Sequence, residues 1–134
     1  MQLPAIPEAI PEVRQAVEAR ALEFGISEKS LYDLKTVVSE ACTNVVRYAY
    51  DEEPGPLEVE LSPDERSLKV LVRDRGCGIA PKVESDLPSL HMGLPLIGAL
   101  SSRFVLSSER GVGTELEIHV PMGSSPVAAG VIKA

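Results

Sequence analysis

Residues 57–78 read LEVELSPDERSLKVLVRDRGCG, in which two runs of alternating apolar and polar residues flank the turn-forming segment SPDERS. Alternation with a period of two places apolar side chains on one face of a strand and polar ones on the other. Two such strands joined by a short turn predict an antiparallel hairpin. Basic residues of the second strand face acidic residues of the first, which favours ion pairs on a solvated outer face. The residues concerned are Glu58, Glu60, Lys69 and Arg73.

A second hairpin is predicted near the C-terminus, where RFVLSS (103–108) and TELEIHV (114–120) flank the turn segment ERGVG. Apolar and polar residues alternate in the last strand, so we expect His119 to occupy an exposed position on the polar face. Every predicted strand therefore has one apolar and one largely polar face. This pattern is typical of antiparallel sheets that helices cover on one side only.

Two helices are predicted ahead of the first hairpin. Residues 8–24 carry apolar side chains at spacings of three and four, which marks one face of a helix, and the following glycine ends it. Ser27 is the favoured N-cap of a second helix that runs to about Tyr50, with Ser30 and Asp33 as alternative starts. The apolar face of this second helix is formed by Leu31, Leu34, Val38, Cys42, Val45 and Ala49. Its opposite face is polar and carries Asp33, Thr36, Glu40, Asn44 and Arg47.

These elements predict one α+β domain, a two-layer sandwich in which helices cover one face of a mostly antiparallel sheet. A chain of 134 residues is long enough for one core and too short for two ordinary domains. We place the domain at residues 1–122 and expect a flexible tail over residues 123–134, where small residues show little pattern. A short helix is expected between the hairpins from about Gly93.

The composition excludes several functional classes. The net charge is −7 and the 13 basic residues are scattered, which argues against nucleic acid as a partner. No apolar run approaches the roughly 18 residues of a membrane span, and the N-terminus lacks the features of a secretory signal, so we expect a cytoplasmic protein. Cys42 and Cys77 offer neither metal-ligand spacing nor a disulfide framework, and Cys42 is expected in the core. The P-loop motif and the nucleophile elbow of hydrolases are also missing.

Candidate functional residues lie in four separate segments. Glu40 and Asn44 fall one turn apart on the polar face of the second helix, although such a pair taken alone is more commonly a solvated helix face. Asp74 leaves a strand into DRGCG, where alternate glycines let the backbone approach a flat ligand, although an ordinary glycine-rich turn has the same pattern. Two further glycine segments follow, MGLPLI (92–97) and GVGT (111–114).

Taken together and in this order, the four segments resemble the motifs of the GHKL ATP-binding family. SEACTNVVRYAY resembles its N box, and DRGCGI, MGLPLI and GVGT resemble its first, second and third glycine boxes. The resemblance covers about residues 1–120 and implies the Bergerat fold, in which helices lie over one face of a mixed sheet. Within the family, the small size and the stretch LKTVVSEACTNVVRYAY are most similar to the anti-sigma factor serine kinases.

The resemblance implies roles for individual residues. Asn44 would give its side-chain oxygen to Mg²⁺, and Glu40 would polarise or deprotonate the attacking hydroxyl. Asp74 would accept a hydrogen bond from the adenine amine, and Thr114 would support the same contact directly or through water. The remaining residues of the ATP site would come from the three glycine boxes and allow close backbone approach: Gly76, Gly78, Gly93, Leu94 and Gly113.

The same resemblance implies a protein serine/threonine kinase that uses ATP and Mg²⁺. Its substrate would be an anti-anti-sigma protein, with sequestration of a sigma factor as a further role, and a homodimer formed through the N-terminal strand and helix is also implied. Two departures keep a second interpretation open, because Tyr48 stands where the N box usually has histidine and His91 replaces the first glycine of the second box. The alternative is a non-catalytic nucleotide-binding module that regulates by binding proteins.

Overall fold

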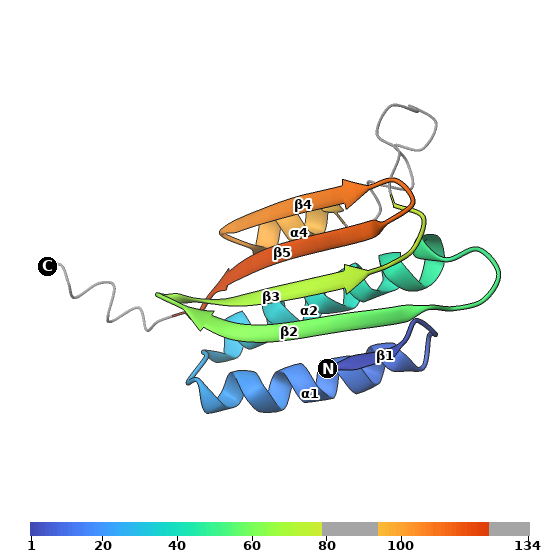
Figure 1. Cartoon of the computed structure of the whole chain (residues 1–134). Helices are drawn as coiled ribbons and strands as arrows, with labels where there is room; N and C mark the ends of the chain where they lie inside the picture. The colour runs from blue at the N-terminus through green and yellow to red at the C-terminus, as the bar shows by residue number, and fades with distance from the viewer. Residues whose placement is uncertain (79–93, 124–134) are drawn as a thin grey trace, which may run out of the picture.

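The computed structural model describes residues 1–78 and 94–123 (Figure 1). Its helices are α1 (Ala9–Glu23), α2 (Glu28–Asn44), the π-helical turn η1 (Val45–Ala49) and α4 (Leu94–Leu100). Its strands are β1 (Gln2–Pro4), β2 (Pro56–Asp64), β3 (Ser67–Asp74), β4 (Arg103–Glu109) and β5 (Gly113–Pro121). No helix within these two ranges is long and apolar enough to cross a membrane.

The five strands form one sheet in the order β1-β2-β3-β5-β4, and every neighbouring pair is antiparallel. Helix α1 packs on β2, α2 lies against β3 and β5, and α4 lies against β4, so the helices cover one face of the sheet (Figure 1). The predicted two-layer α+β sandwich and both hairpins are confirmed. The resemblance implied a mixed sheet, but the part of the chain that is described contains antiparallel pairs only.

Local sequence signals set the boundary between α1 and α2. Gly25 follows the end of α1 with a φ of 79°, a left-handed conformation that glycine adopts without strain. The side chain of Ser27 accepts a hydrogen bond from the backbone N–H of Ser30 at 3.2 Å, which confirms Ser27 as the N-cap of α2. The helix expected to reach Tyr50 does continue to residue 49, but its last turn has π geometry.

The core lies between the sheet and the two long helices. The apolar face predicted for α2 is mostly buried, and Val37 and Ala41 are buried beside it, so the face is wider than predicted. Burial raises the pKa of the Cys42 thiol to about 12, which keeps it protonated as a core residue, as expected. The buried apolar side chains of the strands are Leu57, Val59, Leu68, Val70, Val72, Leu116, Ile118 and Val120.

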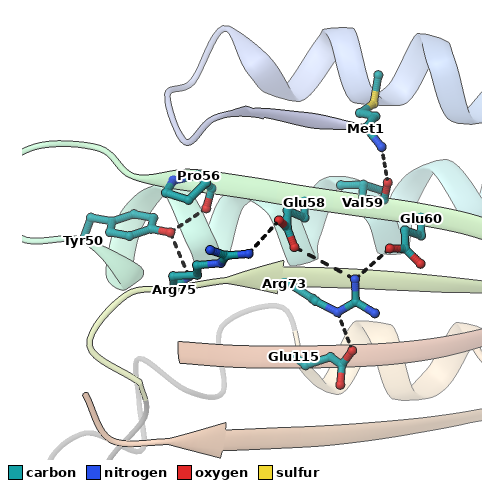
Figure 2. Close-up of polar contacts among 9 residues, drawn as sticks. All are labelled: Met1, Tyr50, Pro56, Glu58, Val59, Glu60, Arg73, Arg75 and Glu115. Atoms are coloured by element: carbon teal, nitrogen blue, oxygen red, sulfur yellow. Dashed lines mark hydrogen bonds and ion pairs between the residues drawn. The ribbon is translucent and has the colours of Figure 1, made fainter. Parts of the chain in front are cut away.

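The outer face of the sheet carries the predicted ion pairs. Arg73 Nη1 lies 2.8 Å from Glu60 Oε2 and 4.0 Å from Glu58 Oε1 (Figure 2). Arg73 Nε also lies 2.6 Å from Glu115 Oε2, a partner on β5 that was not predicted. Lys69, the other predicted cation, makes no such contact with the acidic side chains of the described strands.

The expectation that His119 is exposed is wrong, since only 7% of the residue is accessible. Its Nδ1 lies 3.3 Å from Asp64 Oδ2, and its Nε2 lies 2.6 Å from Glu117 Oε2. Two carboxylates therefore lie against the two nitrogens of the ring and shield it on the outer face. Alternation along β5 predicted the correct face for His119 but not that Asp64 and Glu117 shield its ring from solvent.

Three further elements complete the comparison with the sequence. Strand β1 was not predicted from the residue pattern, although the resemblance implied an N-terminal strand, and its pairing with β2 is extended by a 3.0 Å hydrogen bond from the Met1 ammonium to the Val59 carbonyl (Figure 2). The short helix expected from about Gly93 is α4, which begins at Leu94. Gly93 itself, His91 and the predicted tail beyond residue 123 lie outside the described residues.

Candidate functional site

A pocket lies where α2 and η1 face the ends of β3 and β5. Its wall is mostly apolar, and four polar side chains, from Asn44, Tyr48, Asp74 and Thr114, reach it. Such a combination of apolar walls and few polar groups is typical of small-molecule sites. The complete lining is Ala41, Asn44, Val45, Tyr48, Ala49, Val72, Asp74, Gly78, Leu94, Leu106, Thr114 and Leu116.

Asp74 is the most unusual polar residue of the pocket. It is the last residue of β3, and alternation along this strand turns its side chain to the inner face, where it is 9% exposed. Its Oδ1 accepts a hydrogen bond from the Gly76 backbone N–H at 2.9 Å. Burial raises the pKa of the Asp74 carboxyl, and backbone N–H groups of Gly76 and Thr114 lower it in part. No arginine or lysine in the described ranges pairs with this carboxylate, so its remaining acceptor capacity is open to a donor in the pocket.

Thr114 lies directly opposite Asp74 in the β3–β5 register, as the predicted shared contact requires. Its Oγ1 lies 3.0 Å from the Oγ of Ser108 on β4. Ser108 was not predicted, because the β4–β5 register that brings it beside Thr114 cannot be read from either strand alone. Three neighbouring strands thus contribute to one edge of the pocket.

The glycines of the predicted boxes allow close contact between segments of the chain itself. A Cβ added at Gly76 would lie 1.9 Å from the carbonyl oxygen of Ala49, and one at Gly113 would lie 2.1 Å from that of Asp74. Gly78 has a φ of 78° and lines the pocket. Gly76 and Gly113 therefore allow close backbone packing next to the pocket without lining it, and Gly78 lines it. The resemblance implied that these glycines let the backbone approach the nucleotide, whereas the nearest neighbour of a Cβ at Gly76 or Gly113 is protein backbone.

Asn44 and Glu40 lie one turn apart on α2, as predicted, and they relate to the pocket differently. Asn44 lines it, whereas Glu40 lies one turn away and is not part of its wall. Both residues are partly exposed. The chain offers no group of three or more His, Cys, Asp and Glu residues within its described ranges that would hold a metal by itself. An amide oxygen at the pocket fits a magnesium ion that is held largely by phosphate and water.

The sequence therefore anticipated most polar residues of the pocket and few of its apolar ones. Asn44, Asp74, Gly78, Leu94 and Thr114 converge on it as expected. Tyr48 was noted only as a departure from a motif, yet it forms part of the wall. The apolar lining was assigned to the core, because periodicity does not distinguish a residue facing a pocket from one packed against protein.

Comparison with known proteins identifies similar chains. A family model described as the histidine kinase-like ATPase domain matches residues 3–120. The serine-protein kinase RsbW of Bacillus thuringiensis is 28% identical over 125 residues, which covers 84% of this chain and 78% of the relative. The RsbW of Bacillus velezensis is 42% identical over 77 residues, which covers 57% of this chain and 48% of the relative.

Solved structures show the same fold. The blue-light activated histidine kinase EL346 of Erythrobacter litoralis superposes with a TM-score of 0.61 at 23% identity, over 76% of this chain and 33% of that one. The histidine kinase AdeS of Acinetobacter baumannii gives a TM-score of 0.53 at 16% identity, over 92% of this chain and 68% of that one. At these identities the likeness concerns the fold alone.

Proposed function

The chain belongs to the histidine kinase-like ATPase domain family, and from this premise we propose that it is an ATP-dependent protein serine/threonine kinase of the anti-sigma factor type. Its substrate is a serine of an anti-anti-sigma protein of the STAS type, and sequestration of a sigma factor is a second role. The similarity to serine-protein kinase RsbW supports this class. The observation that carries the proposal is the buried Asp74 carboxylate, which has no cationic partner in the described structure and faces an apolar pocket.

Asp74 supports an adenine nucleotide as the ligand. Its carboxylate accepts hydrogen bonds, and the adenine exocyclic amine is a donor that guanine lacks at the corresponding position. The apolar walls suit a flat purine ring, and Thr114 stands beside Asp74 to support the same contact. The raised pKa of Asp74 fits this role, because a ligand donor offsets the cost of the buried charge.

Asn44 and Glu40 supply the groups for phosphoryl transfer. Asn44 holds Mg²⁺ through its amide oxygen, and the ion contributes neutralisation of phosphate charge when it is bound. Glu40, one turn earlier on α2, accepts the proton of the substrate serine hydroxyl. The serine oxygen then bonds to the γ-phosphorus while the bond between that phosphorus and the leaving oxygen of ADP breaks. Glu40 lies one turn from Asn44 and outside the wall of the pocket, so the proposal requires the substrate serine to reach it from outside the pocket.

Two variants on one helix test the proposal. Glu40→Gln is expected to bind ATP nearly as the wild type does and to lose roughly 10²-fold or more in transfer, the effect of removing a general base. Asn44→Ala is expected to weaken binding of the magnesium nucleotide and transfer together. The measurement is transfer of radiolabelled phosphate, or a mass shift, on a STAS-type anti-anti-sigma protein with its serine intact or replaced by alanine.

The alternative is a nucleotide-binding module that regulates only by binding proteins. The absence of Glu40 from the pocket wall favours it, since a base must reach the reacting hydroxyl. Binding of ATP without labelling of the serine protein, together with no effect of Glu40→Gln, would establish this alternative. Both candidates imply a cytoplasmic setting with protein partners, and a homodimer is compatible with either.

A further inference from the structure

We propose that Tyr50 is a positioning residue for adenine recognition, whose hydroxyl fixes the peptide that follows Asp74 and thereby aims the carboxylate into the pocket. This inference rests on the proposed adenine-binding role of Asp74. Tyr50 does not line the pocket, so any effect it has on the ligand is transmitted through Asp74 and its loop.

The Tyr50 hydroxyl bridges two backbone segments (Figure 2). It donates a hydrogen bond to the carbonyl oxygen of Pro56 at 2.5 Å and accepts one from the backbone N–H of Arg75 at 2.9 Å. Its ring lies so close to Gly55 that a Cβ added there would fall 2.4 Å from a ring carbon. The sequence therefore leaves room for this ring at the start of β2. The hydroxyl is held at both its donor and its acceptor side.

The Arg75 amide belongs to the peptide bond that joins Asp74 to Arg75. Fixing that N–H therefore limits rotation of the backbone on the C-terminal side of Asp74. The Asp74 Oδ1 accepts from the Gly76 N–H, the next amide along the chain. Two successive amides thus point to different acceptors, one to Tyr50 and one to Asp74 itself. Losing the first leaves the turn that holds the carboxylate less constrained.

A second contact ties the same loop to the same end of the helix. The carbonyl oxygen of Ala49, the last residue of η1, accepts a hydrogen bond from the Cys77 N–H at 2.9 Å. Gly76 allows this contact, because any side chain there would collide with the Ala49 carbonyl. Ala49 and Tyr50 therefore hold the loop after β3 at two neighbouring points. The helical turn that follows Asn44 and the loop that follows Asp74 are joined in this way.

Other contacts at Arg75 are weaker candidates for the same role. Its guanidinium lies 3.3 Å from Glu58 Oε2, but the Arg75 side chain is 71% exposed (Figure 2). An exposed ion pair of this kind has little ordering effect in water. Burial raises the pKa of the Tyr50 phenol, so the hydroxyl keeps the proton that it donates to Pro56. The neutral hydroxyl is thus the stronger constraint on the backbone.

Tyr50→Phe removes only the bridging oxygen, and Tyr32→Phe is its matched control, because Tyr32 is 72% exposed on α2 and does not line the pocket. The readout is the ratio of two dissociation constants, for Mg–ATP and for Mg–purine riboside triphosphate, which lacks the exocyclic amine. Tyr50→Phe is expected to weaken ATP binding about 3- to 10-fold and to leave binding of the analogue unchanged, so that the ratio of the ATP constant to the analogue constant rises by the same factor. Tyr32→Phe is expected to keep the wild-type ratio.

A merely structural role for Tyr50 would lower the unfolding temperature and leave the ratio unchanged, and that result overturns the inference. If the wild type itself binds both nucleotides equally, adenine recognition by Asp74 fails and the inference falls with it. If Tyr50→Phe does not fold, hydrogen exchange of the Arg75 amide in the wild-type protein tests the inference instead. The Arg75 amide should exchange its hydrogen more slowly with ATP bound than with the analogue bound, and equal rates contradict the proposal.

Discussion

Arg73 and Asp74 are neighbours in β3, yet their side chains lie on opposite faces of the sheet and only one of the two charges is paired with an opposite charge. On the outer face Arg73 lies within ion-pair distance of Glu58, Glu60 and Glu115. On the inner face Asp74 has only backbone amides as partners among the described residues. The outer charges are paired with opposite charges of the protein, whereas the inner charge has no cationic partner among the described residues.

The pKa directions express the same difference. Hydrogen bonds to Glu60 and Glu115 raise the pKa of Arg73, and the hydrogen bond from Arg73 lowers the pKa of Glu60. Burial raises the pKa of Asp74 instead. A pKa shift that favours the ionised form in the folded protein adds to stability. A pKa shift that disfavours the ionised form of a residue in a pocket is instead a sign of a functional site.

The largest effect is expected at Gly76, on the pocket side of this comparison. Gly76→Ala would place a Cβ 1.9 Å from the Ala49 carbonyl, and backbone on both sides limits relaxation. We expect a loss of about 2–4 kcal/mol in unfolding free energy, together with loss of nucleotide binding. Gly98→Ala is the control, since its nearest neighbour is the Phe104 ring at 3.2 Å. Similar unfolding curves for the two variants would show that the loop contact is not tight.

Asp74→Asn should separate binding from stability. We expect ATP affinity to fall by about 1–3 kcal/mol, because an amide can present a donor where the adenine amine needs an acceptor. The unfolding temperature at neutral pH should stay equal or rise, because the substitution removes a buried charge with a raised pKa. Calorimetric titration and thermal unfolding measure the two effects. A variant that lost stability and kept its ATP affinity would contradict the account, because Asp74 would then contribute to stability and not to nucleotide binding.

Arg73→Gln should affect the outer face only. The Arg73 side chain is 34% exposed and its partners are accessible, so the unfolding midpoint is expected to fall by roughly 1–4 °C. Added salt should shrink this difference, and ATP affinity should remain at the wild-type value. A large loss of ATP affinity would mean that the outer network positions Asp74, and the two faces would then not be independent.

The smallest effect is a difference in pH dependence. Ionisation of Asp74 disfavours folding, so the stability advantage of Asp74→Asn should be absent at low pH and develop as the pH rises through the raised folded-state pKa. Glu60 has a lowered pKa, so its stabilising effect is present above its ordinary value of 4.5 and is lost as the pH falls through the folded-state value. The unfolding midpoints of Asp74→Asn and Glu60→Gln should each differ from that of the wild type by about 1–3 °C at neutral pH, upward for Asp74→Asn and downward for Glu60→Gln, and a series from pH 3 to 7 measures how each difference disappears at low pH.

The sequence predicts elements whose burial is periodic. The apolar faces of α1, α2 and the two hairpins follow from spacings of three to four and of two, and Asn44 and Asp74 could be placed from those elements. Strand β1 has three residues, too few to show a period, and its pairing with β2 is extended by the Met1 ammonium. The η1 turn was missed because a shift in backbone hydrogen bonding leaves no mark in composition.

Contacts between distant segments could not be predicted from the sequence either. The pairing of Arg73 with Glu115 depends on the register between β3 and β5, which the residues between them do not fix. The bridge from Tyr50 to Arg75 depends on how the end of η1 meets the loop after β3. His119 was misassigned for a related reason, since its cover comes from Asp64 on another strand as well as from Glu117.

The central claim is that the pocket binds an adenine nucleotide through Asp74. Its most direct test is calorimetric titration of the wild-type chain with ATP and GTP, each with and without Mg²⁺. The account predicts that ATP binds at least about 10-fold more tightly than GTP and that Mg²⁺ strengthens ATP binding. Equal affinity for the two nucleotides, or no binding of either, would contradict it.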